Sequence, residues 1–176
     1  MRKSGRIGAL GAALMSMACL APPAMAEAVE SCGTAPLRGD RVALLIGNSA
    51  YNDWEWPSLR NAVNDIDYVC DAFAKAGIAP RIVRNADMAS LDAAITRFAG
   101  EAAGAKSVII YYAGHGFEYG GRNWLVPMDA PPATRRGDVE KRYLSIEAAV
   151  RRVVPAGAFT LVVVGAWRTA DPGVRL

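Results

Sequence analysis

The sequence predicts an α/β domain built on a mostly parallel β-sheet with helices on both faces. Three observations support this prediction. Four short apolar runs alternate along the chain with amphipathic, helix-like segments. The runs are continuously apolar, which is typical of strands buried on both faces. Glycine, proline and asparagine mark the joins between segments, so the connections are short. Alternating strands and helices of this kind form parallel sheets covered on both sides.

The expected elements follow in order along the chain. Apolar runs bounded by turn residues predict strands over residues 41–48, 78–84, 106–113 and 159–164. Apolar positions at three- and four-residue steps predict helices over residues 61–76, 88–103 and 144–154. Gly77 is expected to end the first helix. A small hairpin is expected over residues 117–127, around Gly120-Gly121, and a loop over residues 130–142.

The first 26 residues have the pattern of a secretory signal peptide. A positively charged start precedes the apolar run Ile7–Ala21, and Ala24-Met25-Ala26 resembles a cleavage site. An uncleaved anchor is the alternative, but fifteen apolar residues are fewer than the roughly 20 that span a bilayer. We therefore expect a leader segment over residues 27–39, one domain over residues 40–172, a periplasmic or secreted location, and no stable membrane insertion after cleavage.

Charge and composition exclude several classes of function. The chain has 20 Lys+Arg and 17 Asp+Glu, and three of the basic residues lie in the expected signal peptide. The mature chain is then formally neutral, which gives no support to nucleic-acid binding. One histidine with two cysteines makes no credible zinc site, so neither a metal nor a cofactor is expected. Cys70 lies on an apolar helix face and is expected to be buried and reduced, with a disulfide to Cys32 left open.

Two strand ends carry the candidate site. His115 is the only histidine and follows the third apolar run, in Ala113-Gly114-His115-Gly116. The fourth run opens into Gly165-Ala166-Trp167-Arg168. Ligands of open parallel sheets collect at the carboxyl ends of the strands. If the two strands are neighbours, we expect both tips to face one cleft.

These residues resemble the caspase-type cysteine peptidases, in particular their bacterial caspase-like members. Trp167 lies 52 residues after His115, and the signature of caspases places the histidine roughly 50 residues before the catalytic cysteine. Three further fragments resemble the family in the family's order: residues 41–51, 59–65 and 123–129. The resemblance covers nearly the whole mature chain.

The resemblance implies roles for five residues. His115 would be the base, Gly116 an oxyanion donor, and a peptide or protein the substrate. The family pattern Asp-Ala-Cys-Arg is replaced by Gly165-Ala166-Trp167-Arg168. An indole has no nucleophilic atom at neutral pH, so Trp167 would remove the chemistry. Gly165 replaces an acid that, in Arg/Lys-specific relatives, helps form the pocket for a basic side chain, and Arg168 keeps the family residue beside it.

Three functional hypotheses follow. The first is an exported caspase-like domain that has lost its nucleophile and binds peptides, proteins or an active relative. The second is a functional cysteine endopeptidase whose nucleophile is altered in this sequence. The third is a truncated chain without a selected function, because relatives continue past the nucleophile strand while this chain stops at Leu176. Such a stop would leave the fourth strand as an apolar edge.

Overall fold

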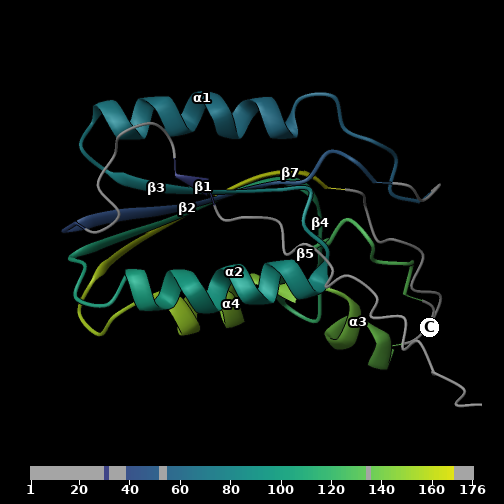
Figure 1. Ribbon diagram of the computed structural model, residues 1–176. Coiled ribbons are helices and arrows are strands. Elements are labelled where there is room, and N and C mark those ends of the chain that lie inside the picture. The colour runs from purple at the N-terminus through teal and green to yellow at the C-terminus, as the bar shows by residue number, and fades with distance from the viewer. Residues whose placement is uncertain (1–29, 32–38, 52–54, 134–135, 169–176) are drawn as a thin grey trace, which may run out of the picture.

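The computed structural model describes residues 30–31, 39–51, 55–133 and 136–168. The expected signal peptide and most of the expected leader lie outside the described residues. The described chain is an α/β fold with a mixed sheet between helical layers, as the sequence predicts (Figure 1). No helix among the described residues is both long and apolar enough to span a bilayer.

Seven strands form one sheet, with parallel pairing at its centre. The order is β1-β3-β2-β4-β5-β6, and β7 also pairs with β4. The pairs β2/β3, β2/β4 and β4/β7 are parallel, whereas β1, β5 and β6 join antiparallel. The strands are β1 (Glu30–Ser31), β2 (Arg41–Gly47), β3 (Ala79–Arg84), β4 (Ser107–Tyr119), β5 (Arg122–Leu125), β6 (Leu144–Ser145) and β7 (Phe159–Arg168).

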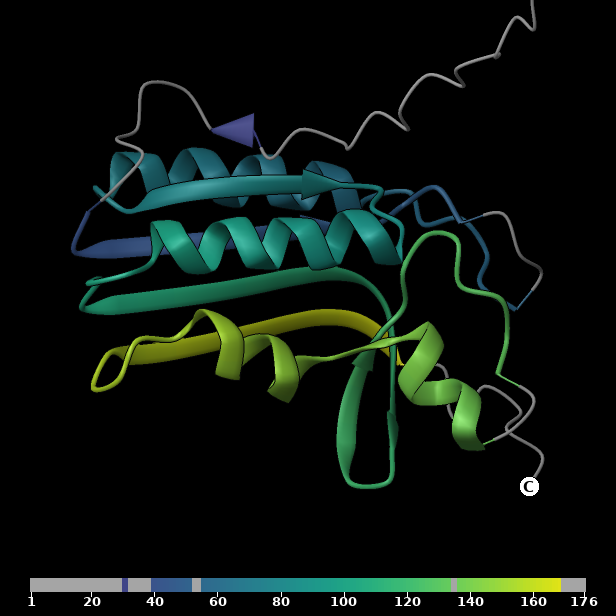
Figure 2. The same cartoon turned by 60° about the horizontal axis from the view of Figure 1, so that its bottom comes forward.

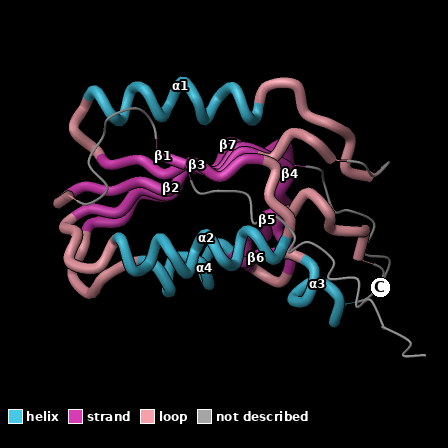
Figure 3. Tube along the Cα trace, viewed as in Figure 1, coloured by secondary structure: helices cyan, strands magenta, loops and turns pink. Residues whose placement is uncertain are grey.

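Helices cover both faces of the sheet, and Figure 3 shows the three layers. The helices are α1 (Ala62–Lys75), α2 (Met88–Glu101), α3 (Arg136–Arg142) and α4 (Ile146–Val153). α1 packs on one face, against β2, β3 and β4, and α2 lies on the other face beside α4. In Figure 2, α3 lies near the β4–β5 hairpin, away from the parallel strands.

Local sequence signals explain most element ends. Gly77 has a φ of 70° and follows α1, as expected for a helix-ending glycine. The side chain of Asp87 caps α2 by accepting the Ser90 amide, and this hydrogen bond holds the pKa of the Asp87 carboxyl below its ordinary value. Gly120 and Gly121 have φ values of 63° and 71°, the left-handed geometry that a two-residue hairpin turn requires.

Five predicted elements need correction. β4 does not end before His115 but continues to Tyr119, and β7 continues through Trp167 to Arg168. His115 and Trp167 therefore lie within strands and not in turns, because each strand keeps a pairing partner beyond its predicted end. The expected loop over residues 130–142 contains α3, and the expected leader contains β1. The short β6 precedes α4, where only a helix is expected.

Cys70 corrects the prediction of a reduced thiol. The residue is buried in the layer between α1 and the sheet, as its helical position predicts. Its sulfur is disulfide-bonded, however, so periodicity identified its burial but not its redox state. The candidate partner from the sequence, Cys32, lies outside the described residues.

β7 lies at the border of the described sheet. Among the described strands it pairs with β4 alone. Phe159, Leu161, Val163 and Val164 have exposed fractions between 36% and 65%, and only Val162 packs on the main core. The described part of β7 is therefore an apolar strand with one open edge, as the sequence predicts.

Candidate functional site

His115 lies where β4 changes its partners. β2 pairs with β4 as far as Ala113, and β5 begins to pair at Gly116. Between these points the strand is flanked by the loop that joins β2 to α1. On this edge of β4, Gly114 and His115 therefore face loop residues, while the opposite edge of β4 pairs with β7. The imidazole is buried, with 3% of the residue exposed.

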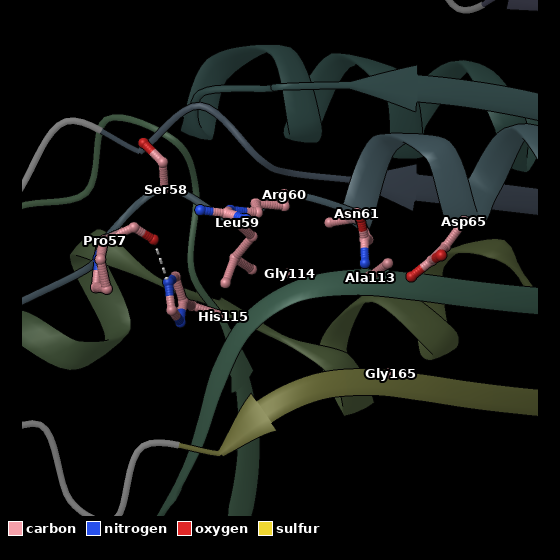
Figure 4. Close-up of a pocket in the computed structure, with 11 residues that line it drawn as sticks. Pro57, Ser58, Leu59, Arg60, Asn61, Asp65, Ala113, Gly114, His115 and Gly165 are labelled. Carbon is pink, nitrogen blue, oxygen red and sulfur yellow. Dashed lines mark hydrogen bonds between the residues drawn. The ribbon is translucent and has the colours of Figure 1, made fainter.

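The loop from β2 to α1 fixes the imidazole of His115. The ring atom Nε2 lies 2.7 Å from the carbonyl oxygen of Pro57, as the dashed line in Figure 4 shows. A carbonyl only accepts hydrogen bonds, so Nε2 carries the proton and donates it. In the neutral ring Nδ1 is then unprotonated. Nδ1 is buried and has no hydrogen-bond partner within the described residues, so it is free to accept a proton.

Burial determines the proton affinity of this ring. It lowers the pKa of His115 from the ordinary value of 6.5, and the hydrogen bond to Pro57 opposes this effect. The neutral, proton-accepting form is therefore favoured at neutral pH. The ring also has two aromatic neighbours, Tyr51 at 4.7 Å and Trp56 at 5.4 Å between ring centroids. Trp56 is itself buried in an aromatic core cluster with Tyr51 and Phe117.

A buried asparagine joins the loops around the site. The side chain of Asn48 accepts the Ala86 amide at 2.9 Å and donates to the Val126 carbonyl at 3.2 Å. The Asn48 amide donates to the carbonyl of Ala113. These bonds connect the ends of β2 and β3 to the segment after β5, so the surroundings of His115 are held from several sides.

Trp167, which the family resemblance places at the nucleophile position, is the register partner of His115. β7 is the parallel neighbour of β4, and the register pairs His115 with Trp167 and Gly116 with Arg168. The expectation that the two apolar runs are adjacent strands is thus confirmed. The side chains of residues 166–168 lie outside the described part, so the register places Trp167 by its backbone alone. Gly116 is also paired with Leu125 of β5, and its role as an oxyanion donor stays a prediction.

A cavity of about 500 Å³ opens beside His115 (Figure 4). It lies between the β2–α1 loop, the start of α1 and the tips of β4 and β7. Gly165 lines it, as expected, whereas Gly116 does not. The lining residues are Pro57, Ser58, Leu59, Arg60, Asn61, Ala62, Asp65, Ala113, Gly114, His115 and Gly165. Within the described residues, no cluster of histidine, cysteine and acidic side chains is placed to hold a metal ion.

Two charged residues line this cavity that the sequence interpretation did not assign to the site. The carboxylate of Asp65 and the guanidinium of Arg60 form no hydrogen bond or ion pair with another side chain among the described residues. Burial raises the pKa of Tyr111, and the negative charge of Asp65 raises it further. The cavity therefore keeps an acidic group although position 165 is a glycine.

Sequence reasoning missed Tyr51, Pro57 and Asp65. Tyr51 and Asp65 each stand at the end of a fragment that resembles the family, so the fragments contained the signal. Pro57 acts through its backbone carbonyl, which no residue-type pattern identifies.

The fold and the geometry around His115 define a caspase-like α/β domain. A family model described as the Caspase domain matches residues 40–154, and the chain belongs to this family. Mucosa-associated lymphoid tissue lymphoma translocation protein 1 homolog of Mus musculus is 34% identical over 98 residues. The Homo sapiens protein, Mucosa-associated lymphoid tissue lymphoma translocation protein 1, is 33% identical over the same length. The alignments cover 54% of this chain and 11% of each relative.

Proposed function

We propose that this caspase-like peptidase domain binds peptides at the cavity beside His115 and does not cleave them. The observation that carries the proposal is the register of β4 and β7, which pairs the backbone of His115 with that of Trp167. A cysteine peptidase needs a thiolate next to its histidine, and an indole can only donate a hydrogen bond. The open cavity beside His115 leaves room for a ligand.

The charges of the cavity support a preference for peptides with a basic side chain. Among the described residues, no side chain pairs with the Asp65 carboxylate at the cavity wall, and a lysine or arginine of the ligand would pair with it. Arg60 lies in the same cavity and would hold a carbonyl or carboxylate of the ligand. Because the Asp65 carboxylate is open to solvent, the ion pair is worth about 1 kcal/mol or less, up to roughly fivefold in affinity.

Isothermal titration of the mature chain with short peptides tests this proposal. Peptides with a central arginine or lysine should bind more tightly than the same peptide with norleucine or aspartate. Asp65→Asn should weaken the arginine peptide about two- to fivefold and leave the norleucine peptide unchanged. Asp71→Asn is the matched control, since Asp71 is an exposed carboxylate of α1 that does not line the cavity. Equal binding of arginine and norleucine peptides would remove the proposed preference, and no binding of any peptide would remove the binding role.

The second hypothesis, a peptidase with an altered nucleophile, has one observation in its favour. His115 has an unprotonated Nδ1 with no hydrogen-bond partner in the described part of the chain, and its pKa is lowered, both of which suit a general base. Trp167→Cys would restore a thiol next to this base. We expect little or no gain of activity, because productive cleavage also needs substrate held in line with the nucleophile, and misplacement alone can cost about a hundredfold. Robust cleavage by Trp167→Cys would favour the second hypothesis.

We also propose that the protein is exported. The disulfide at Cys70 supports this, because disulfides persist in oxidising compartments such as the periplasm. The signal-peptide pattern of residues 1–26 points the same way. Intact mass of protein from the envelope or medium should begin at Glu27. Recovery of the full-length chain with Met1 from the cytoplasm would contradict export.

A further inference from the structure

Two tyrosine hydroxyls hold the backbone of His115. The amide of His115 donates to the hydroxyl of Tyr51 at 3.0 Å, and the hydroxyl of Tyr112 donates to the carbonyl of His115 at 2.7 Å. The Tyr51 hydroxyl in turn donates to the carbonyl of Val126 at 3.1 Å. The hydroxyl of Tyr51 is thus a bridge between the His115 amide and the Val126 carbonyl, beside the direct backbone bond in which the Val126 amide donates to the His115 carbonyl at 3.0 Å.

The protons of this network can be assigned without conflict. Each tyrosine has one hydroxyl proton, and burial raises the pKa of both Tyr51 and Tyr112, so both stay protonated at neutral pH. Tyr112 uses its proton on the carbonyl of His115, and Tyr51 uses its proton on the carbonyl of Val126. The Tyr51 oxygen then remains available to accept the His115 amide.

Tyr51 also contacts the imidazole itself. Its ring meets the ring of His115 edge to face, at 4.7 Å between centroids and 64° between planes. Tyr51 and Pro57 lie in the same loop, between β2 and α1. One loop therefore fixes His115 at three points: Tyr51 holds its amide and packs on its ring, and Pro57 accepts its Nε2 proton.

From this arrangement we infer that Tyr51 is a positioning residue that keeps the His115 imidazole in one orientation and one tautomer, with Nδ1 left as the proton acceptor. Without the hydroxyl, the amide of His115 would lose its partner in a buried place, and β4 would shift to satisfy it. The ring would then move away from Pro57. The inference rests on the proposed function only in treating His115 as part of the ligand site. Its test measures the tautomer and the pKa of the imidazole and does not involve ligand binding.

Nuclear magnetic resonance of the single histidine gives a direct test. In ¹⁵N-labelled wild-type protein, His115 should be in the Nε2–H tautomer. Tyr51→Phe keeps the ring and removes the hydroxyl. We expect a mixture of both tautomers and a His115 pKa shifted upwards, because a displaced ring reaches solvent and loses part of its burial.

Tyr143→Phe is the matched control. The hydroxyl of Tyr143 also bonds to two backbone groups, those of Ala133 and Pro131, and Tyr143 is buried. Among the described residues it is linked to His115 through the ring of Trp56, which packs on both, and no hydrogen bond joins it to His115 directly. This variant should lose stability and keep the wild-type tautomer and pKa of His115. A wild-type imidazole spectrum in Tyr51→Phe, or an equal change in Tyr143→Phe, would overturn the inference.

A measurement on the wild-type protein does not depend on whether the variant folds. The Tyr51 hydroxyl proton should exchange slowly enough to give its own resonance, with a nuclear Overhauser effect to the amide proton of His115. A His115 amide that exchanges freely with solvent, with no such hydroxyl signal, would contradict the bridge.

Discussion

Replacement of Gly114 by alanine would place a methyl group between the two tyrosine hydroxyls that hold His115. An added Cβ would lie closest to the Tyr112 hydroxyl, within 2.6 Å of Cζ of that ring and 2.8 Å of the Tyr51 hydroxyl. Atoms of folded proteins do not pack this closely, so something must move. Neither ring can move easily, because Tyr51 and Tyr112 are both at most 2% exposed and bonded to backbone groups.

The loss of stability in Gly114→Ala combines overpacking of the core with the loss of hydrogen bonds. Inserting a methyl group into a packed core costs about 1–3 kcal/mol. Separating the tyrosines from His115 adds about 1 kcal/mol for each hydrogen bond lost. Gly114→Ala should therefore lower the free energy of unfolding by about 2–5 kcal/mol, a large part of the roughly 5–15 kcal/mol of a typical domain. With a mid-range urea slope of about 2 kcal/mol per molar, the midpoint should fall by about 1–2.5 M.

Urea unfolding followed by circular dichroism measures this change, and Gly100→Ala is the matched control. Gly100 lies in α2, and an added Cβ there would meet no atom within 4 Å. Alanine is the better helix former, so the control should gain about 0.5–1 kcal/mol. If Gly114→Ala unfolds within about 0.5 kcal/mol of the wild type, the packing around His115 is not as the structure describes.

Three further predictions concern the histidine and the open strand. Burial lowers the pKa of His115 in the folded state. The contribution of the neutral imidazole to the free energy of unfolding is therefore complete above about pH 6.5 and is lost as the pH falls through the folded-state pKa. The free energy of unfolding of His115→Gln should not show this decrease. Tryptophan emission should decrease as His115 is protonated, and Trp56→Phe should remove the change, since the rings are 5.4 Å apart; a change that persists in Trp56→Phe would point to another tryptophan. Leu161→Lys, at an exposed position of β7, should reduce concentration-dependent self-association in sedimentation velocity with little effect on stability; unchanged self-association would show that the β7 edge is not its cause.

The sequence predicts the parallel centre of the sheet well, because buried strands and amphipathic helices leave continuous and three-to-four-residue patterns. It predicts strand ends poorly at His115 and Trp167. Glycines next to His115 and two residues before Trp167 indicate turns locally. β4 and β7 nevertheless extend, because they pair with each other and β4 also pairs with β5, and this pairing outweighs the local preference.

The sequence likewise predicts part of the site. His115 stands out by its context, and the adjacency of the two strands follows from the fold class. The acceptor for the Nε2 proton of His115 cannot be predicted in this way, because the acceptor is the backbone carbonyl of Pro57. The hydroxyl of Tyr51 meets the His115 amide across 64 positions of sequence, and only the folded chain brings the two together.

The central claim is that the domain keeps a base and a ligand cavity but has no nucleophile. Incubation of the mature chain with quenched fluorescent peptides containing arginine, lysine or aspartate tests this most directly. We expect a rate equal to that of His115→Ala and of buffer alone, because no acyl intermediate can form on an indole. Turnover that is abolished both by His115→Ala and by alkylation of thiols would contradict it, and would show that a cysteine of this chain serves as the nucleophile.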